Sequence, residues 1–285
     1  MGANIIDGKL TAKEIRNKIK IEVEELKDRS KTQPGLAAVL VGENPASQVY
    51  VRNKRRACDQ AGIYSEERKL SADISQEDLL KLINELNEDK RIDGILIQLP
   101  LPSHIDSKVI LESVSPFKDV DGFHPYNLGR LLIGDPLFSS CTPYGVIVML
   151  EYYNIQIEGK EAVIIGRSNI VGKPLSVMLT AKNATVTVCH SKTGNLKEVC
   201  RRADILVAAI GRPRMVTGDM VKDGVVVVDV GINRLNNGTL AGDVDFDTVS
   251  KKASWITPVP GGVGPMTIAM LLQNTLDSAK RKVEQ

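Results

Sequence analysis

The chain has few of the residues that build disulfide frameworks and transition-metal sites. Its 285 residues include four cysteines and three histidines. The cysteines form no Cys-x-x-Cys motif and the histidines are not paired at ligand spacing, so we expect neither a disulfide scaffold nor a metal site. Four scattered cysteines also suit a reducing compartment.

Long apolar runs are missing as well. A membrane-spanning helix needs about 18 or more consecutive apolar residues, and no segment of the chain approaches that length. The first residues lack the basic and apolar segments of a signal peptide. We therefore expect a cytoplasmic protein with no membrane partner.

No strong charge of either sign is present, since the formal net charge is +2. The densest basic clusters, residues 54–56 and 201–202, are too short for a nucleic-acid-binding patch, so no nucleic-acid partner is expected. Hydrophobic residues make up 42% of the chain. This content and the length suit a protein of about two domains.

Helix and strand patterns alternate in the first third of the chain. We expect a first helix capped by Thr11 with Glu14, and a second that has Asn44 as its cap and Pro45 as its first residue. The predicted helices are residues 11–29, 44–62 and 75–87, and the predicted strands are residues 36–41, 64–70 and 95–97. This alternation indicates a mainly parallel sheet covered by helices. Residues 103–140 are expected to form loops and turns.

The second half alternates again, after a helix expected from residue 142 to about residue 153. Strands are predicted at residues 162–165, 185–189, 204–210 and 225–230, with helices at residues 174–181 and 196–201. This pattern is typical of a Rossmann-like unit. A last helix from Pro265 has no strand after it and is expected to return to the first domain. We therefore predict an α/β fold of two domains with parallel sheets, comprising residues 1–140 plus 265–285 and residues 141–264.

A glycine-rich turn joins the strand at residues 162–165 to the following helix. Such a turn presents backbone N–H groups and the positive end of a helix dipole, which together bind anions. Compared with the dinucleotide motif G-x-G-x-x-G, Ser168 replaces the second glycine, and the next glycine after Gly166 is Gly172. An ordinary strand-to-helix turn explains the pattern equally well until its context is added.

The next strand, residues 185–189, ends without the acid that usually holds the ribose of NAD. Residues 190–193 (HSKT) follow it instead. Their hydroxyls and lysine, together with Arg167, could accept the 2′-phosphate of NADP, so NADP is favoured over NAD. The alternative is a polar turn with no ligand.

Lys54 occupies an unusual place on the helix that starts at Pro45. At 100° per residue it lies one turn after Tyr50, away from its basic neighbours. The apolar face is expected to contain Ala46, Val49, Tyr50, Asn53, Ala57 and Ala61. Either the lysine extends to solvent from the edge of this face, or it is a partly desolvated amine that can transfer protons.

Three further polar residues are candidates for a site. Gln98 ends the strand at residues 95–97, at the edge where parallel sheets bind ligands, although a solvent-exposed glutamine is an equal alternative. Asp119 and Asp121 are two residues apart and could form a cation site or a carboxylate pair. The same pattern is also common in ordinary turns.

Several separated segments together resemble the bifunctional methylenetetrahydrofolate dehydrogenase/cyclohydrolase family. These segments are residues 47–54 (SQVYVRNK), 94–102 (GILIQLPLP), 118–123 (KDVDGF), 141–143 (CTP), 166–174 (GRSNIVGKP), 229–233 (DVGIN) and 258–265 (PVPGGVGP). The resemblance runs nearly end to end, and it implies two α/β domains with a cleft between them. It implies oxidation of 5,10-methylenetetrahydrofolate by NADP, then hydrolysis of the methenyl product to 10-formyltetrahydrofolate.

The resemblance also implies roles for individual residues. Lys54 is the acid–base group of the hydrolytic step, and Gln98 hydrogen-bonds it and helps to keep it neutral. Tyr50 stacks on the aminobenzoyl ring of the folate, and Asp121 holds the pterin. The remaining folate contacts implied are Ile97, Leu99, Pro260, Gly261, Gly262, Val263 and Gly264. The NADP contacts implied are Gly166, Arg167, Ser168, Ser191 and Ile232.

Two alternatives stay open at this stage. A relative that kept only the dehydrogenase step is disfavoured by the presence of both Lys54 and Gln98. A non-catalytic NADP-binding regulator would have a degraded set of these two residues and Asp121. The resemblance further suggests a homodimer and a link to purine biosynthesis, and Cys141 is given no chemistry.

Overall fold

The computed structural model describes residues 2–235 and 237–284, without the side chain of Ala46. The described chain divides into two compact units. One contains the chain up to Ala12 and residues 142–267, and the other contains residues 13–141 and the chain from Ile268 on. We name them the six-stranded unit and the three-stranded unit after their main sheets.

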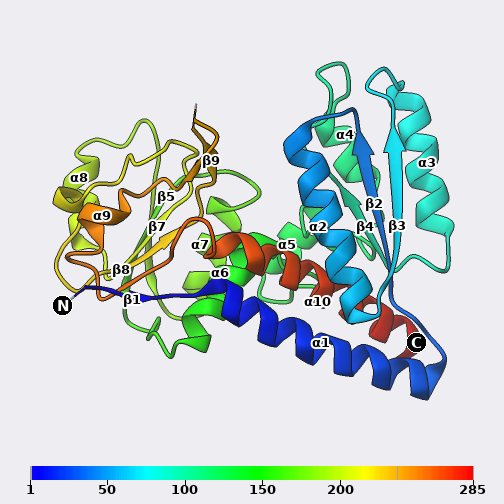
Figure 1. Cartoon of the computed structure of the whole chain (residues 1–285), viewed down its shortest axis with the longest axis horizontal. Coiled ribbons are helices and arrows are strands. Elements are labelled where there is room, and N and C mark those ends of the chain that lie inside the picture. The colour runs from blue at the N-terminus through cyan, green and yellow to red at the C-terminus, as the bar shows by residue number, and fades with distance from the viewer. Residues whose placement is uncertain (1, 236, 285) are drawn as a thin grey trace. The chain divides into compact units, whose positions relative to one another are not determined.

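The three-stranded unit is built on a parallel sheet with the order β3-β2-β4. Its strands are β2 (Gly35–Val41), β3 (Tyr64–Leu70) and β4 (Gly94–Ile97). Figure 1 shows the arrows of β2 and β3 side by side and pointing the same way. Every residue of β2 is buried, as expected of a central parallel strand that is covered on both faces. The predicted parallel sheet is therefore confirmed.

Four helices follow these strands within the unit. They are α2 (Pro45–Ala61), α3 (Gln76–Glu88), α4 (Ser107–Ser113) and α5 (Pro125–Leu132). Asn44 Oδ1 accepts from the N–H of Ser47 at 3.2 Å, which confirms the predicted cap of α2. The expectation of only loops and turns between residues 103 and 140 was wrong, because α4 and α5 lie there. Both are short and carry local caps, Asp106 and His124, which sequence periodicity does not reveal.

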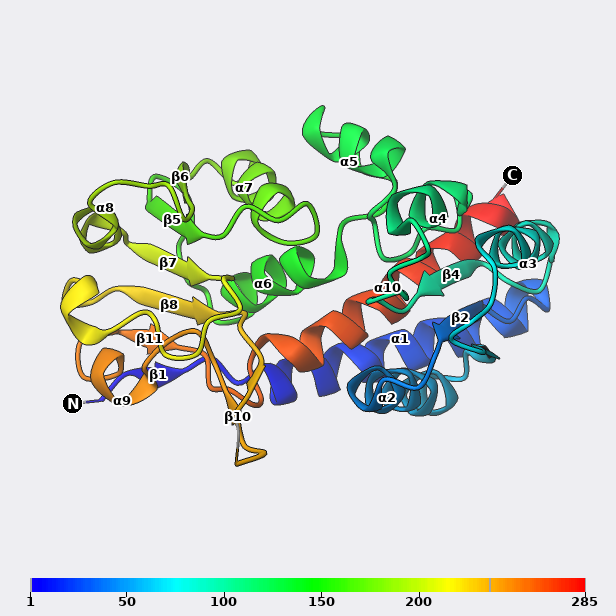
Figure 2. The same ribbon diagram turned by 90° about the horizontal axis from the view of Figure 1, so that it is seen from above.

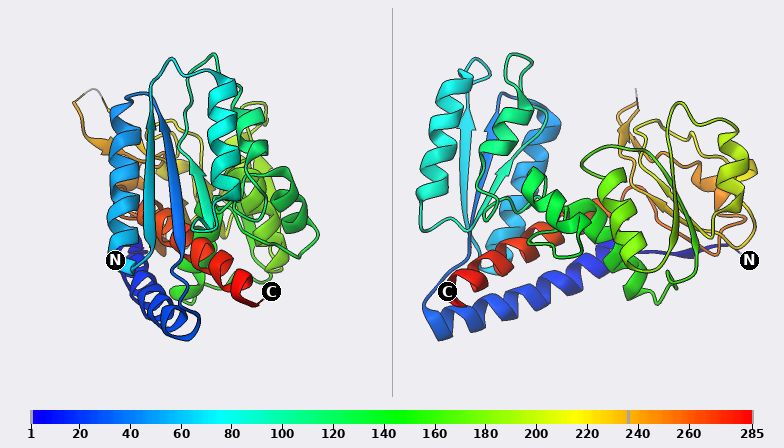
Figure 3. Two further views of the ribbon diagram at one scale, coloured as in Figure 1. Left: turned by 90° about the vertical axis from the view of Figure 1, so that its right-hand side faces the viewer. Right: turned by 180° about the vertical axis from the view of Figure 1, so that it is seen from behind.

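Two long helices, α1 (Gly8–Ser30) and α10 (Val263–Glu284), run next to each other (Figure 3). Within the three-stranded unit Lys280 of α10 pairs with Glu22 of α1 at 2.5 Å. The predicted capping box of α1 was wrong. Asp7 caps the helix by accepting from the N–H groups of Lys9 and Leu10, and Thr11 already lies inside the first turn, where its hydroxyl donates to the Asp7 carbonyl.

The six-stranded unit has a wholly parallel main sheet with the order β1-β11-β8-β7-β5-β6. Figure 2 shows β6, β5, β7, β8, β11 and β1 in this order. The strand bounds are β1 Asn4–Ile5, β5 Glu161–Ile165, β6 Thr185–Cys189, β7 Ile205–Ala208, β8 Val226–Asp229 and β11 Trp255–Ile256. The predicted Rossmann-like unit with a parallel sheet is confirmed.

Residues 2–12 belong with this sheet and not with the first domain, to which the sequence pattern assigns them. The reason is that β1 pairs with β11, Asn4 opposite Trp255 and Ile5 opposite Ile256. A two-residue strand carries no detectable periodicity, so only its pairing identifies it. Residues 268–284, by contrast, lie with the three-stranded unit, as expected for the last helix.

The remaining elements of the six-stranded unit connect its strands. They are α6 (Cys141–Tyr152), α7 (Gly172–Ala181), α8 (Leu196–Arg202), a 3-10 turn (Gly218–Met220), α9 (Phe246–Val249) and an antiparallel hairpin of β9 (Asn233–Arg234) and β10 (Leu240–Ala241). From β5 the chain passes through α7 to β6 on one side. It then returns through α8 to β7 on the other side of β5. The carboxyl end of β5 is therefore a topological switch point, where open α/β sheets bind ligands. Across the described parts of the chain, no helix is long and apolar enough to cross a membrane.

Candidate active site

Lys54 and Gln98 meet at the carboxyl edge of the three-stranded sheet. Lys54 projects from α2 and is only 8% exposed. Its Nζ donates to Oε1 of Gln98 at 3.2 Å, and Nε2 of Gln98 donates to the Leu99 carbonyl at 2.8 Å. The second bond fixes which way the amide points, so its oxygen faces the amine. Of the alternatives for Lys54 and Gln98, the structure therefore selects the buried, paired one.

The buried face of α2 differs from the predicted one. The sheet covers positions spaced by three and four residues, namely Ser47, Val51, Lys54, Ala57, Cys58 and Ala61. Val49 and Tyr50, which the predicted apolar face includes, are 41% and 39% exposed, and Asn53 is exposed too. Val51, Lys54 and Cys58 are spaced by three and four residues and therefore form one stripe on the buried side of α2. Tyr50 therefore lies at the rim of this face, one turn before Lys54.

The carboxyl group of Asp121 lies within electrostatic reach of Lys54. Burial raises the pKa of this carboxyl, and the positive charge of Lys54 together with a hydrogen bond from the Cys141 thiol opposes the rise. A carboxyl in such a place ionises only with the support of a cation or of donors. Lys54, Gln98 and Asp121 thus form one polar cluster in the three-stranded unit.

The carboxylate of Asp119 is engaged in local hydrogen bonds, which argues against a cation site or a carboxylate pair with Asp121. Its carboxylate accepts from the backbone N–H groups of Phe123 and His124 at 3.2 and 2.8 Å and from Nδ2 of Asn127 at 2.8 Å. Burial still raises its pKa to about 6. Asp119 therefore shapes the turn that carries Asp121. Within residues 2–235 and 237–284, no group of three or more histidine, cysteine or acidic side chains could hold a metal ion.

Three residues that sequence reasoning missed hold the backbone around Asp121. Asn274 is 3% exposed on α10, and its Nδ2 donates to the carbonyls of Val120 and Ser139 at 2.7 and 3.0 Å. The Ser140 hydroxyl donates to the Gly122 carbonyl at 2.8 Å. The third residue, Cys141, donates its backbone N–H to the Asp121 carbonyl at 3.3 Å and its thiol to the Val120 carbonyl at 3.2 Å. Burial raises the pKa of the Cys141 thiol well above its usual value, so it remains a neutral donor. For Asn274, a single asparagine among the apolar positions of the last helix is the sequence feature that could have indicated this role.

In the six-stranded unit, Gly166 stands at the topological switch point after β5. Its φ is +131°, and a Cβ there would lie 2.2 Å from the carbonyl oxygen of Ala209, which follows β7. Gly172, the first residue of α7, is equally confined, since its Cβ would lie 2.1 Å from the Gly166 carbonyl oxygen. Both positions therefore require glycine, Gly166 for the tight turn after β5 and Gly172 for the close packing of α7 on that turn.

Ser168 occupies the place of the motif's second glycine and closes the turn. Its hydroxyl accepts from the N–H groups of Val171 and Gly172 at 3.1 and 3.4 Å. Arg167 beside it is exposed. The turn after β5 therefore combines the positive side chain of Arg167 with the N-terminus of α7. Both features favour the binding of a phosphate.

The other residues assigned to the nucleotide follow neighbouring strands of the same sheet. Ser191 is exposed two residues after β6, in a turn closed by a 2.9 Å bond from the His190 N–H to the Thr193 hydroxyl. Ile232 follows β8 and is 44% exposed. Both therefore lie past the carboxyl ends of parallel strands, as Gly166 does.

The segment from Pro260 to Gly264 belongs to the six-stranded unit and packs on the start of α1. Gly261 has a φ of +115°, and its carbonyl accepts from the Lys9 N–H at 3.0 Å. A Cβ on Gly8 would lie 1.8 Å from the Gly262 carbonyl oxygen. The first turn of α1 therefore shapes this glycine-rich segment.

Two family models match almost the whole chain. The model described as "Tetrahydrofolate dehydrogenase/cyclohydrolase, catalytic domain" matches residues 6–121, and the corresponding NAD(P)-binding domain matches residues 140–283. The curated protein "Bifunctional protein FolD" of Moorella thermoacetica is 59% identical over 99% of this chain and 100% of its own length. The chain belongs to the tetrahydrofolate dehydrogenase/cyclohydrolase family.

Solved structures of family members have the same fold as this chain. The bifunctional FolD enzyme from Campylobacter jejuni is 53% identical, has a TM-score of 0.96, and covers 98% of this chain and 99% of its own. FolD of Trypanosoma brucei, solved with NADP cofactor and an inhibitor, is 40% identical with a TM-score of 0.97 over 100% of both chains. The predicted family, fold class and nicotinamide nucleotide are therefore confirmed. The individual site residues remain predictions.

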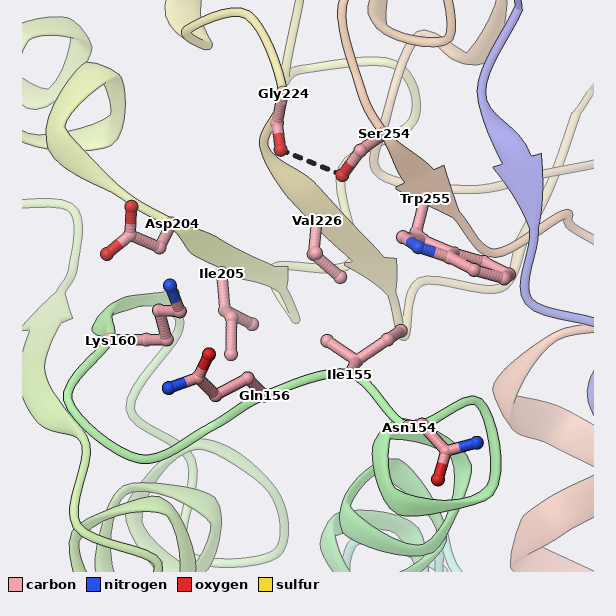
Figure 4. A pocket seen from close by; sticks show the side chains of 10 residues that line it. All are labelled: Asn154, Ile155, Gln156, Lys160, Asp204, Ile205, Gly224, Val226, Ser254 and Trp255. Carbon is pink, nitrogen blue, oxygen red and sulfur yellow. Dashed lines mark hydrogen bonds between the residues drawn. The ribbon is translucent and has the colours of Figure 1, made fainter.

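The six-stranded unit also has a cavity of about 290 Å³ at the edge of its sheet opposite the Gly166 turn. Figure 4 shows its lining residues, among them Lys160, Asp204, Gly224 and Ser254, which precede β5, β7, β8 and β11. The Ser254 hydroxyl donates to the Gly224 carbonyl at 2.8 Å. Since these residues stand at the amino ends of the strands, the cavity is separate from the edge that carries Gly166.

Proposed function

We propose that this chain oxidises 5,10-methylenetetrahydrofolate to the methenyl form with NADP and hydrolyses that product to 10-formyltetrahydrofolate. The observation that carries both activities is the buried Lys54–Gln98 pair beside Asp121, in a chain whose other unit contains the Gly166 turn. A dehydrogenase alone has no use for a buried amine. A non-catalytic regulator would need neither the amine nor its partner, so both alternatives are disfavoured.

For NADP, the fit rests on the Gly166 turn at the switch point after β5, which leads directly into the N-terminus of α7. We propose that Ser168 and the start of α7 receive the pyrophosphate, that Arg167 and Ser191 receive the 2′-phosphate, and that Ile232 packs on the nucleotide. When bound, NADP supplies the acceptor for the hydride. The chain's contribution to this step is orientation, because the substrate nitrogen provides the electron push and no protein acid or base is needed.

For the folate, we propose that Asp121 accepts hydrogen bonds from the amino and ring N–H groups of the pterin. The raised pKa of Asp121 supports this, since a buried carboxylate gains most from new donors. Tyr50 is exposed enough at the rim of α2 to stack on the aminobenzoyl ring. The other proposed contacts are Ile97, Leu99, Pro260, Gly261, Gly262, Val263 and Gly264.

Lys54 is proposed as the proton carrier of the hydrolytic step. Water adds to the methenyl carbon, and Nζ of Lys54 takes one proton from it. That proton passes to the ring nitrogen as the carbon–nitrogen bond breaks, and the second proton of the water is lost to solvent as the hydroxyl becomes the formyl carbonyl. Gln98 keeps the amine in place by accepting one of its hydrogens. General acid–base catalysis of this kind contributes about 10²- to 10⁴-fold in rate.

The finer assignments follow from this function. We propose a cytoplasmic homodimer whose 10-formyltetrahydrofolate serves purine biosynthesis. We also propose that the unit containing Lys54 supplies the catalytic and pterin-binding side chains for the folate and that the unit containing Gly166 binds NADP. The near-complete match to two domains of one family supports this division.

The test is an assay of the purified chain that follows NADPH and methenyltetrahydrofolate absorbance separately. With methylenetetrahydrofolate and NADP we expect NADPH to form and methenyl absorbance to rise and then decay. Supplying NAD in place of NADP should reduce the rate. Absence of NADPH formation would reject the oxidoreductase, and methenyl absorbance that persists at its spontaneous rate of decay would reject the cyclohydrolase.

A further inference from the structure

A cavity of the three-stranded unit, about 530 Å³ in volume, lies away from the proposed folate site. Ile92 and Asp93, which line it, directly precede β4, whereas Gln98 directly follows that strand. Four strand residues separate the two ends by about 13 Å. The rest of the lining comes from the end of α3 and the residues after it, from residues 115–118 and 137–138, and from the last turns of α10. The cavity is therefore at the amino edge of the sheet.

The charges around this cavity do not balance. Its lining contains four cationic side chains and two carboxylates, which are Lys90, Lys118, Arg281, Lys282, Glu88 and Asp93. Asp93 is 3% exposed and already accepts from Lys282 at 3.0 Å and from the Gly35 N–H at 2.9 Å. The lining thus has an excess of two positive charges, and its one buried carboxylate is engaged. An anion is favoured over a cation here.

Arg281 has unused hydrogen-bonding capacity in this lining. Its Nη2 donates to the Leu137 carbonyl at 2.6 Å, and its guanidinium lies 4.8 Å from the centre of the Phe138 ring. Its Nη1 is enclosed and has no hydrogen-bond partner in the part of the chain that the structure describes. Leaving a buried donor unpaired costs about 1–3 kcal/mol. A guanidinium held in this way suits a carboxylate or phosphate oxygen.

Lys118 adds a second donor. Its Nζ donates to the carbonyls of Leu86 and Asp89 at 3.0 and 2.8 Å, and an ammonium has three hydrogens to donate. Burial lowers the pKa of Lys118, and the carboxylates of Asp93, Asp89 and Glu88 offset this shift only in part. An anionic oxygen in the cavity would offset the remainder.

The remaining walls are apolar. Phe138 is 3% exposed and closes the cavity, whereas Phe117 at its edge is 58% exposed. Ile92 and Leu137 add aliphatic surface. We propose that this cavity, lined by Lys118, Arg281 and Phe117, binds a small organic anion in which a carboxylate or phosphate is attached to an aromatic body. The site is independent of the proposed folate and NADP sites.

Isothermal titration calorimetry of the full-length chain with 2-naphthoate tests the proposal. The titration is repeated with saturating NADP and with 2-naphthyl phosphate, 2-naphthylmethanol and inorganic phosphate as ligands. We expect one naphthoate per chain with or without NADP, and at least tenfold weaker binding of the neutral alcohol. Tighter binding of the naphthyl phosphate than of naphthoate would identify phosphate as the preferred headgroup, and the reverse result would identify carboxylate. No binding of either anion at millimolar concentration, or displacement of naphthoate by NADP, would overturn the proposal.

Variants locate the binding. Arg281→Gln should weaken naphthoate binding at least tenfold, and Phe117→Ala, which alters only an exposed side chain, should weaken it about threefold. Arg202→Gln removes an exposed arginine of the other unit and should change nothing. The hydride-transfer rate of each variant reports whether it folds. Unchanged binding in both cavity variants would contradict the site, whatever the outcome for the proposed enzymatic function.

Discussion

The two proposed binding regions are built from different parts of the polypeptide. At the Gly166 turn the decisive atoms are backbone, and the structure has no room for a Cβ at Gly166 or Gly172. In the three-stranded unit the decisive atoms belong to side chains, namely the buried Lys54, its partner Gln98 and Asp121 nearby. The first region depends on the absence of a side chain at two glycines, and the second depends on the polar side chains of three residues.

This difference explains why the sequence predicts the two regions to different extents. Glycine-dependent turns are local, so their spacing along the chain already predicts their shape. The side-chain cluster joins residues 54, 98 and 121, and it is in turn held by Asn274, more than 150 positions farther along. The proposed hydrolytic step therefore depends on long-range packing of side chains, whereas the proposed nucleotide site depends on backbone turns at the carboxyl ends of neighbouring strands, with Gly166 held against the Ala209 carbonyl. Four substitutions test this contrast, in order of decreasing expected effect.

Replacement of Lys54 by methionine should have the largest effect. We expect methenyl hydrolysis to fall by about 10²- to 10⁴-fold, because the proton carrier is lost, while hydride transfer retains a measurable rate. Decay of methenyl absorbance and formation of NADPH measure the two steps. Arg56→Met, on the exposed face of the same helix, is the control, and hydrolysis that survives in Lys54→Met would remove Lys54 from the mechanism.

Gly166→Ala should damage the nucleotide site selectively. Because the new Cβ would lie 2.2 Å from the Ala209 carbonyl oxygen, the turn must move. We expect the KM for NADP to rise by about 10- to 100-fold, as for 1–3 kcal/mol of strain. Hydrolysis of added methenyltetrahydrofolate, which needs no nucleotide, should persist.

The matched control for the glycine test is Gly194→Ala. Gly194 is in the same unit, and a Cβ added there would meet no other group of the described residues within 4 Å. Its substitution should leave the KM for NADP unchanged. A similar rise in both variants would mean that the unit responds to any added methyl group, and the assignment of the Gly166 turn to NADP would fail.

Asn274→Leu tests whether α10 positions Asp121. The substitution keeps a similar branched shape but leaves the carbonyls of Val120 and Ser139 without their donor. We expect the KM for methylenetetrahydrofolate to rise about tenfold and the KM for NADP to stay constant. Gln273→Leu, at the neighbouring position, is the control. Equal changes in both KM values would indicate general destabilisation.

Arg167→Ala should have the smallest effect, since an exposed charge is screened by solvent. We expect the KM for NADP to rise about three- to tenfold, the KM for NAD to change less, and the KM for the folate to stay the same. Lys182→Ala, at the exposed far end of α7, is the comparison. A KM for NAD that rises as much as that for NADP would show that Arg167 does not contact the 2′-phosphate.

Much of the fold could be predicted from local patterns. The buried strands β2, β4, β5 and β8 are short apolar runs, and Asn44 and Ser75 cap α2 and α3 as expected. The misses share a cause. Strands of two residues such as β1, short helices such as α4 and α5, and the cap of α1 are decided by partners elsewhere in the chain or by single hydrogen bonds, which periodicity does not report.

The amino-acid sequence by itself determined the alternation of helices and strands, the turn at Gly166 and the set of motifs that identifies the family. These features depend on neighbours a few residues apart, so spacing along the chain is sufficient. Only the tertiary structure decided that Lys54 is buried against Gln98, that Asp119 shapes a turn while Asp121 lies beside Lys54, and that Asn274 holds that turn. Burial and hydrogen-bond partners are properties of packed elements, and no local pattern contains them.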